Sequence, residues 1–180
     1  MTTARALFVA LVAAGCGSSP ASDSGGSSSE IRAPFVAFGD DFAPFRTWPA
    51  TPAVADGIPA GIHGNLGPMT VYRNHAPPAG ATEYPVGTIL VKETQEASPA
   101  ARKVFAMVKR GGDFNDTGAR GWEWFELQNA DDGTPFVLWR GLGPPAGETY
   151  GGDANGGCNS CHAGAKSDDY VWTTALALHP

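Results

Sequence analysis

The sequence lacks an excess of basic residues. Its 180 residues include 12 Lys and Arg against 18 Asp and Glu, which gives a formal net charge of −6 at pH 7. Nucleic-acid binding needs clustered Lys and Arg, so this balance argues against a nucleic-acid partner and against an electrostatic membrane patch. The apolar stretch near the start, from Ala6 to Ala14, is too short to cross a bilayer, because a crossing helix takes about 20 residues.

Cysteine is also scarce, with three in the whole chain. Cys158 and Cys161 form a Cys-x-x-Cys pair, and Cys16 stands alone near the start. A four-thiolate zinc site commonly combines two such pairs, and a second pair is missing here. The single pair therefore needs another explanation.

The pair is followed at once by a histidine, in the motif Cys158-Asn159-Ser160-Cys161-His162. Cys-x-x-Cys-His is the attachment motif of a c-type haem. Two thiols at this spacing add to the two vinyl groups of the porphyrin, and the adjacent imidazole binds the iron. We therefore expect haem c as the cofactor, bound through Cys158 and Cys161, with His162 as the iron ligand.

Two alternatives to haem are half of a zinc site and a redox dithiol beside an incidental histidine. We favour haem because the start of the chain independently supports it. A haem-ligating His162 needs a partner for its other ring nitrogen, commonly a backbone carbonyl. The residues from Ala163 to Lys166 are close enough in the chain to supply that carbonyl.

The start of the chain resembles a bacterial lipoprotein signal. Arg5 precedes the apolar stretch, which ends in Ala13-Ala14-Gly15-Cys16, and a Gly- and Ser-rich run follows. We expect a signal peptide over residues 1–15, a lipidated Cys16 with a tether to residue 32, and a haem domain over residues 33–180. The alternative is an ordinary secretory signal, because Ala13 stands where lipoprotein signals usually carry Leu. Either signal exports the domain to the periplasmic side or the cell surface, and lipidation of Cys16 anchors it to the membrane.

The three cysteines are then all used, one by the lipid and two by the haem, and none is left for a disulfide. An exported domain without disulfides needs another source of stability. A covalent cofactor that fills the core provides one, because binding that only the folded state allows adds to the free energy of folding.

The remaining sequence is punctuated by 24 Gly and 15 Pro, which indicates short elements joined by turns. β-Branched and aromatic runs predict strands at Thr70 to Arg73, Thr88 to Glu93, Lys103 to Arg110, Trp122 to Leu127 and Pro135 to Arg140. Adjacent antiparallel pairing is the simplest topology. The aromatic residues expected in the core are Phe105, Phe125, Phe136 and the tryptophans.

Helix is expected only around Cys158 to Ala165 and from Ser167 onward, where Ser167 can cap a first turn that contains acids. The expected fold class is therefore mainly β with a few short helices (α+β). An antiparallel sheet packs on one covalently bound c-haem, and the haem-bearing helix lies near the C-terminus.

Two familiar haem folds disagree with this arrangement. Small electron-transfer cytochromes carry the motif near the N-terminus and a methionine ligand after it, whereas no methionine follows Cys161 here. Four-helix cytochromes c′ place the motif late but need long helical periodicity before it. A mostly β haem protein with a late attachment motif is an uncommon combination.

Further features run in a fixed order from about Phe45 to Trp172. They are Phe45-Arg46-Thr47-Trp48, His63-Gly64, Val71-Tyr72-Arg73-Asn74, Tyr84-Pro85-Val86-Gly87, Thr88 to Glu93, Ala106 to Arg110, Gly121 to Trp124, and Asp169 to Trp172 after the haem motif. In this order, and together with Cys-x-x-Cys-His, the chain resembles the cytochrome P-460 and cytochrome c′-beta family.

The resemblance implies a β-sheet around one c-haem, usually in a homodimer, with histidine on one side of the iron and an open or weakly occupied site on the other. In the P-460 branch a lysine is cross-linked to the porphyrin edge, and the enzyme oxidises hydroxylamine to nitrogen oxides. In the c′-beta branch there is no cross-link, apolar side chains crowd the distal face, and the protein binds nitric oxide. The branch therefore depends on a lysine at the haem edge and on a distal acid.

Lys92 is the candidate for the cross-link. On its strand it shares a face with Leu90, opposite Ile89 and Val91. With apolar residues on both faces, we expect this strand to be covered on both sides, and desolvation would lower the lysine pKa and free a nucleophilic amine. The alternative is a Lys92 side chain that reaches solvent. Lys109, at the end of its strand, is expected to be solvated.

Glu126 is the candidate for the distal acid, on the same strand face as Trp122 and Trp124. Hydroxylamine must lose protons as it loses electrons, and a buried carboxylate with a raised pKa suits that step. The alternative is an exposed or salt-bridged carboxylate. His63 and His75 are possible sixth ligands, but both lie in Gly- and Pro-rich loops and are better explained as surface groups.

Three functions stay open at this point. The first is a redox enzyme that acts on hydroxylamine or a related small nitrogen species and passes electrons to an unknown acceptor. The second is a nitric-oxide-binding or sensing protein without catalysis. The third is a tethered electron carrier with both axial sites of the iron filled.

Overall fold

The computed structural model describes residues 33–53, 68–96, 98, 101–143 and 157–178. All the described residues belong to one compact unit, Ile31–Pro180. The expected signal peptide, Cys16 and His63 therefore lie outside the described residues. Within the described ranges, none of the helices combines the length and the apolar character that crossing a bilayer requires.

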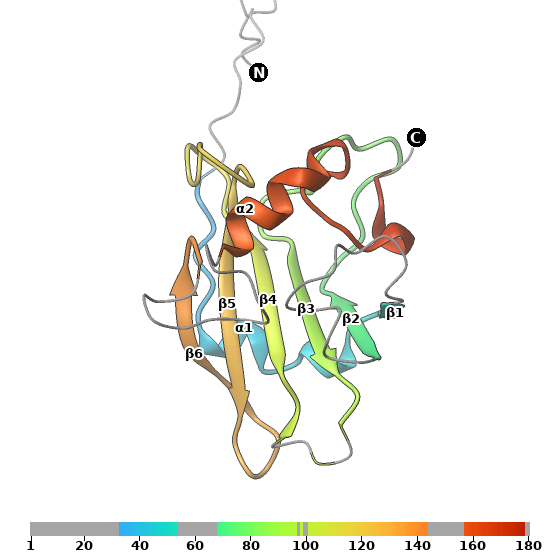
Figure 1. Cartoon of the computed structure of the whole chain (residues 1–180), viewed down its shortest axis with the longest axis vertical. Helices are drawn as coiled ribbons and strands as arrows, with labels where there is room; N and C mark the ends of the chain where they lie inside the picture. The colour runs from blue at the N-terminus through green and yellow to red at the C-terminus, as the bar shows by residue number, and fades with distance from the viewer. Residues whose placement is uncertain (1–32, 54–67, 97, 99–100, 144–156, 179–180) are drawn as a thin grey trace, which may run out of the picture. The chain divides into compact units, whose positions relative to one another are not determined.

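Six strands form one antiparallel sheet in which spatial order follows chain order (Figure 1). They are β1 (Ala50–Ala53), β2 (Met69–Arg73), β3 (Ile89–Thr94), β4 (Val104–Lys109), β5 (Trp122–Asn129) and β6 (Pro135–Gly141). The sequence predicted β2 to β6 and their pairing, and both are confirmed. The additional strand β1 contains Pro52, which is tolerated because β1 is an edge strand.

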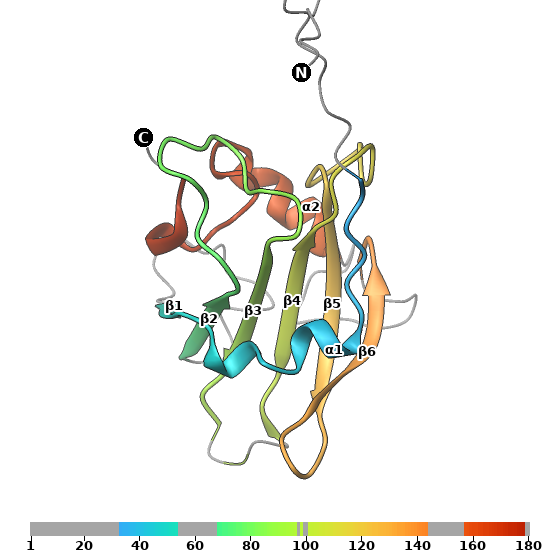
Figure 2. The same ribbon diagram turned by 180° about the vertical axis from the view of Figure 1, so that it is seen from behind.

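Short helices cover both faces of the sheet. They are α1 (Gly39–Phe42), η1 (Phe45–Thr47), α2 (Cys158–His162), η3 (Ala163–Asp168) and η4 (Thr174–Leu176). Figure 1 shows α2 in front of the sheet near β4 and β5, and Figure 2 shows α1 crossing the opposite face. We call the side of α2 the front face and the side of α1 the back face.

The haem motif is helical, as predicted. The prediction of a second helix from Ser167 onward is wrong. Ser167 lies near the end of η3, which stops at Asp168. Asp169 and Tyr170 then adopt left-handed backbone, with φ of 49° and 70°. Two successive residues in this region end the helix and turn the chain back toward the sheet.

Side chains of the central strands alternate between two buried clusters. Leu90, Met107 and Trp124 belong to the front cluster, whereas Val91 and Phe125 belong to the back cluster with the residues of α1 and η1. The central strands are thus covered on both sides, as expected for the strand that carries Lys92. The core prediction is confirmed for Phe125 and for the tryptophans of β5 and β6, whereas Phe105, Trp48 and Trp172 are only half-buried. For Phe136 the prediction is wrong, since this residue is 44% exposed on the edge strand β6.

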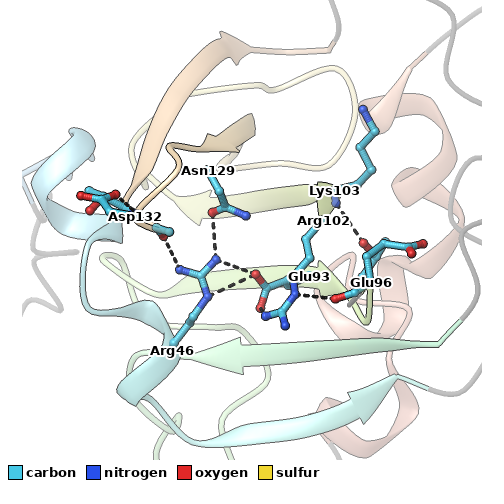
Figure 3. A network of polar contacts seen from close by, with 10 residues as sticks. Arg46, Glu93, Glu96, Arg102, Lys103, Asn129 and Asp132 are labelled. Carbon is cyan, nitrogen blue, oxygen red and sulfur yellow. Dashed lines mark hydrogen bonds and ion pairs between the residues drawn. The ribbon is translucent and has the colours of Figure 1, made fainter. Parts of the chain in front are cut away.

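Ion pairs and hydrogen bonds join η1 to the back face of the sheet (Figure 3). The buried carboxylate of Glu93 accepts a hydrogen bond from Arg46 Nη2 at 2.6 Å and pairs with Arg102 at 3.5 Å. Arg46 also donates to Asn129 Oδ1 at 2.8 Å and to the carbonyl of Gly133 at 2.7 Å. One arginine from η1 therefore bridges β3 to the end of β5, and this bridge resists any slip of the strands.

The loop between β4 and β5 holds the haem motif from one side. The Asn159 side-chain oxygen accepts hydrogen bonds from Asn115 Nδ2 at 2.6 Å and from the backbone N–H of Ala119 at 2.8 Å. A Cβ atom at Gly118 would overlap with the Asn159 amide, so this close approach requires glycine. The variable residue Asn159 of Cys-x-x-Cys-His is thus a structural anchor in this chain.

Replacement of Asn159 by Ala should lower the free energy of unfolding of the holoprotein by about 1–3 kcal/mol, because the buried N–H of Ala119 loses its acceptor. Ser160→Ala is the matched control within the same motif, since the Ser160 hydroxyl is exposed. Its change should stay within about 0.5 kcal/mol. Urea denaturation measures both, and equal losses in the two variants would contradict the anchoring role.

Candidate functional site

One row of cross-strand neighbours runs across the front face beside the haem motif. Val71 pairs with Lys92, Lys92 with Phe105, Phe105 with Glu126, and Glu126 with Trp139. Because residues directly opposite each other on neighbouring strands share a face, the two predicted functional residues lie on one side of the sheet, two strands apart. Phe105 stands between them.

An irregularity in β6 completes this row. The pairing register shifts between Glu126 and Leu127, so that Glu126 faces Trp139 while Leu127 faces Val137. The extra residue, Leu138, lets Trp139 join the front cluster although Val137 packs on the back. Trp139 Nε1 then donates a hydrogen bond to Glu126 Oε2 at 2.9 Å. The buried carboxylate is therefore held in a fixed orientation by an indole.

The imidazole of His162 is fixed from two directions. Its Nδ1 lies 2.7 Å from the carbonyl oxygen of Tyr170, and its ring packs against Trp124 with 4.5 Å between ring centroids. A carbonyl can only accept, so this hydrogen bond puts the proton on Nδ1 and leaves a lone pair on Nε2. Burial lowers the pKa of His162 to about 4, and the nearby Lys92 adds to this effect. A neutral imidazole with Nε2 available suits a metal ligand.

The sequence left open which carbonyl accepts from His162, with Ala163 to Lys166 close enough in the chain to supply it, and the structure assigns this role to Tyr170. Ala163 to Lys166 form most of η3, and the left-handed backbone of Asp169 and Tyr170 follows it. The Tyr170 carbonyl lies 2.7 Å from His162 Nδ1. The expectation that a backbone carbonyl would accept this proton is met by Tyr170.

Lys92 and Glu126 are electrostatically coupled to the haem motif. Burial lowers the pKa of the Lys92 amine to about 7, while the thiols of Cys158 and Cys161 act in the opposite direction. Burial also raises the pKa of the Cys158 thiol to about 11, with Lys92 lowering it and Glu126 raising it. The structure therefore brings Lys92, Glu126 and the motif into one region, although their sequence positions are far apart.

The residues present fit a c-type haem better than they fit the zinc alternative. The thiol of Cys158 packs against the apolar front cluster, where a porphyrin bound to it would meet apolar side chains. Among the described residues, no group of three or more His, Cys, Asp or Glu side chains is arranged to hold a metal ion. In the same part of the chain the buried Nε1 of Trp124 has no hydrogen-bond partner, which suits a surface shaped for a further group.

The prediction that Lys109 is solvated is wrong. The Lys109 side chain is 7% exposed and its Nζ lies 2.6 Å from Asp169 Oδ1. The strand ends beneath the C-terminal segment, so the amine is enclosed although it belongs to the last residue of β4. His75 is exposed, as expected of a surface group, and its Nε2 lies 3.3 Å from Thr88 Oγ1.

Several residues at the site were not predicted. The tryptophans were expected in the core, with one or two of the core aromatics as candidates to cover the haem, but no contact of Trp124 with His162 or of Trp139 with Glu126 was predicted, and the Tyr170 carbonyl was not considered. Their roles depend on the strand register, on the irregularity in β6 and on the left-handed turn. No short sequence pattern signals these three features.

Comparison with known proteins agrees with this site. The family model of cytochrome P460 matches residues 61–173, a range that contains Lys92, Glu126 and the whole Cys-x-x-Cys-His motif. No curated protein and no solved structure matches the chain. Cytochrome P460 proteins are c-type haem iron proteins, and the mainly β architecture and the late haem motif agree with that membership. The chain belongs to the cytochrome P460 family.

Proposed function

We propose that this protein oxidises hydroxylamine, or a related small nitrogen compound, at a c-haem held against the front face of the sheet. Cys158 and Cys161 would hold the haem through two thioether bonds, and His162 would bind its iron through Nε2. The chemistry that a bound haem would supply is the transfer of the electrons of the oxidation to an external acceptor. The observation that carries the proposal is the placement of Lys92 and Glu126 in one row beside the motif.

Lys92 suits a covalent bond to the porphyrin edge. With its pKa lowered to about 7, a large fraction of the amine is uncharged and nucleophilic near neutral pH. An N–C bond would replace one N–H and one C–H bond, which releases two protons and two electrons. An oxidant of the peroxide class is needed to take those electrons. The lysine would then fix the ring from the sheet side, while the two thioethers fix it from α2.

Glu126 suits the removal of protons from the substrate. Each electron taken from hydroxylamine makes its remaining N–H and O–H groups more acidic, so a carboxylate within reach speeds the reaction. Glu126 is buried, at 7% exposure, and Trp139 holds one of its oxygens. A fixed carboxylate on an apolar face can receive a proton without first reorienting.

Nitric oxide binding without turnover is the second candidate function. It is supported by Phe105, which stands between Lys92 and Glu126, and by the apolar neighbours Val71, Leu90 and Met107 on the same face. Apolar side chains that crowd the ligand side favour a small uncharged ligand over a substrate that must be deprotonated. In that case Lys92 would form no bond to the ring.

Replacement of Lys92 by Ala should abolish the spectral signature of the cross-link. The purified wild-type protein is expected to show a red-shifted, broadened ferrous Soret band that persists after denaturation. The variant should instead show an ordinary c-type spectrum, because its haem keeps only the two thioethers. Absorption spectra before and after denaturation provide the measurement.

Lys103→Ala is the matched control for Lys92, because Lys103 is an exposed lysine immediately before β4. Its spectrum should equal that of the wild type. An ordinary c-type spectrum in the wild-type protein itself, combined with nitric oxide binding, would favour the second function over the first.

Replacement of Glu126 by Gln should slow hydroxylamine turnover by roughly 10²- to 10⁴-fold, the usual contribution of a positioned general base. The amide keeps the shape of the side chain and can still accept from Trp139, so haem content should not change. Glu96→Gln is the control, since Glu96 is exposed. Turnover is measured with an artificial electron acceptor, and an unaltered rate in Glu126→Gln would exclude this residue as the base.

A further inference from the structure

A buried ion pair joins the end of β4 to the segment that follows the haem motif. Lys109 Nζ lies 2.6 Å from Asp169 Oδ1, and the two side chains are 7% and 3% exposed. The same Nζ donates to the carbonyl of Arg120 at 3.2 Å and lies 5.2 Å from the ring centroid of Trp122. Both side chains are almost fully removed from solvent, so each charge depends on the other.

Asp169 is held by two further groups of the domain. Its Oδ2 accepts a hydrogen bond from the backbone N–H of Tyr84 at 2.8 Å, and its carbonyl oxygen accepts one from Trp122 Nε1 at 2.8 Å. Asp169 has left-handed backbone, with φ of 49°. A non-glycine residue keeps this backbone only where its surroundings determine it, and here the surroundings are Lys109, Tyr84 and Trp122.

The next residue carries the hydrogen bond to the proposed iron ligand. Tyr170 also has left-handed backbone, with φ of 70°, and its N–H donates to the carbonyl of Ala165 at 2.8 Å. Its carbonyl oxygen accepts from His162 Nδ1 at 2.7 Å. One peptide bond separates the anchored Asp169 from the acceptor of His162, so the position of Asp169 sets the position of that acceptor.

We propose that the Lys109–Asp169 ion pair positions the Tyr170 carbonyl and thereby sets how strongly His162 donates electrons to the haem iron. A strong hydrogen bond from Nδ1 raises the basicity of the imidazole. A more basic ligand stabilises ferric over ferrous iron and so lowers the reduction potential. The proposal rests on the proposed assignment of His162 as iron ligand, but it is independent of hydroxylamine chemistry and of the Lys92 cross-link.

An ion pair serves this purpose in a way that an apolar contact cannot. Apolar side chains of similar volume often stabilise a fold as well as a buried ion pair does, because burial desolvates both charges. Carboxylate oxygens, however, accept hydrogen bonds along defined directions. The two oxygens of Asp169 bind Lys109 and Tyr84 separately, which fixes the orientation of the peptide that leads to Tyr170.

The test neutralises both partners together, as Lys109→Met with Asp169→Asn, so that no charge is left buried alone. Asn tolerates left-handed backbone. We expect the midpoint potential of the holoprotein to rise, with about a tenfold change in the ferric–ferrous equilibrium, or about 59 mV for a one-electron couple. The Fe–His stretching band in the resonance Raman spectrum of the ferrous protein should move to lower frequency.

Two other variants keep the test decisive. Trp122→Phe removes the N–H donor to the Asp169 carbonyl and also reduces the packing of the buried ring against Tyr84 and Lys109. It leaves both charges of the ion pair in place, so it should give smaller shifts in the same directions even if the double variant does not fold. Arg46→Met with Glu93→Gln neutralises the ion pair on the back face (Figure 3). This control should lower the unfolding midpoint and leave the potential and the Fe–His band unchanged.

The inference is overturned if the Lys109–Asp169 variant and Trp122→Phe both keep the wild-type potential and Fe–His band. It is also overturned if the back-face control shifts both readouts equally. Absence of an Fe–His band in the unmodified protein would overturn the assignment of His162 and this inference together. Absence of hydroxylamine turnover alone would contradict only the proposed function.

Discussion

The strand register is the constraint on which the site depends. Side chains alternate between faces, so a one-residue slip of β3 would send Lys92 to the back and a charged Glu93 to the front. The back face opposes such a slip through specific partners, since Arg46 binds Glu93 and Arg140 binds Glu123 with two hydrogen bonds of 2.8 and 2.7 Å. These ion pairs on the back face therefore add stability to a strand register that the alternation of apolar side chains already favours.

Two anchors, one within the haem motif and one after it in the chain, hold the motif against the sheet. Asn159 binds the loop between β4 and β5, and Asp169, on the far side of the motif, binds the end of β4. The partners of both anchors lie at the end of β4 or in the loop between β4 and β5, and these two strands carry Phe105 and Glu126. A short helix such as α2 has little stability of its own, so these contacts fix its distance from the proposed lysine and acid.

Much of the fold follows from local patterns, whereas the details of the site do not. Alternation predicted that Lys92 and Leu90 share a face, and the haem motif predicted α2. Lys109 was misplaced because a strand-end lysine looks solvated unless the distant Asp169 is known to cover it. The pairing of Trp139 with Glu126 depends on an extra residue in β6, and the Tyr170 carbonyl depends on consecutive left-handed residues. Contacts between distant residues and local backbone irregularities leave no periodic pattern in the sequence, so they could not be predicted from it.

The arrangement of the front face has a purpose only if the two thiols of α2 carry a porphyrin against the Lys92–Glu126 row. The decisive experiment is to measure the mass of the protein made in a bacterium that attaches c-type haem, followed by proteolysis. We expect one haem per chain, with the peptide of Cys158 to His162 and the peptide of Lys92 both bound to the same ring. A colourless protein of unmodified mass would show that the two thiols carry no haem.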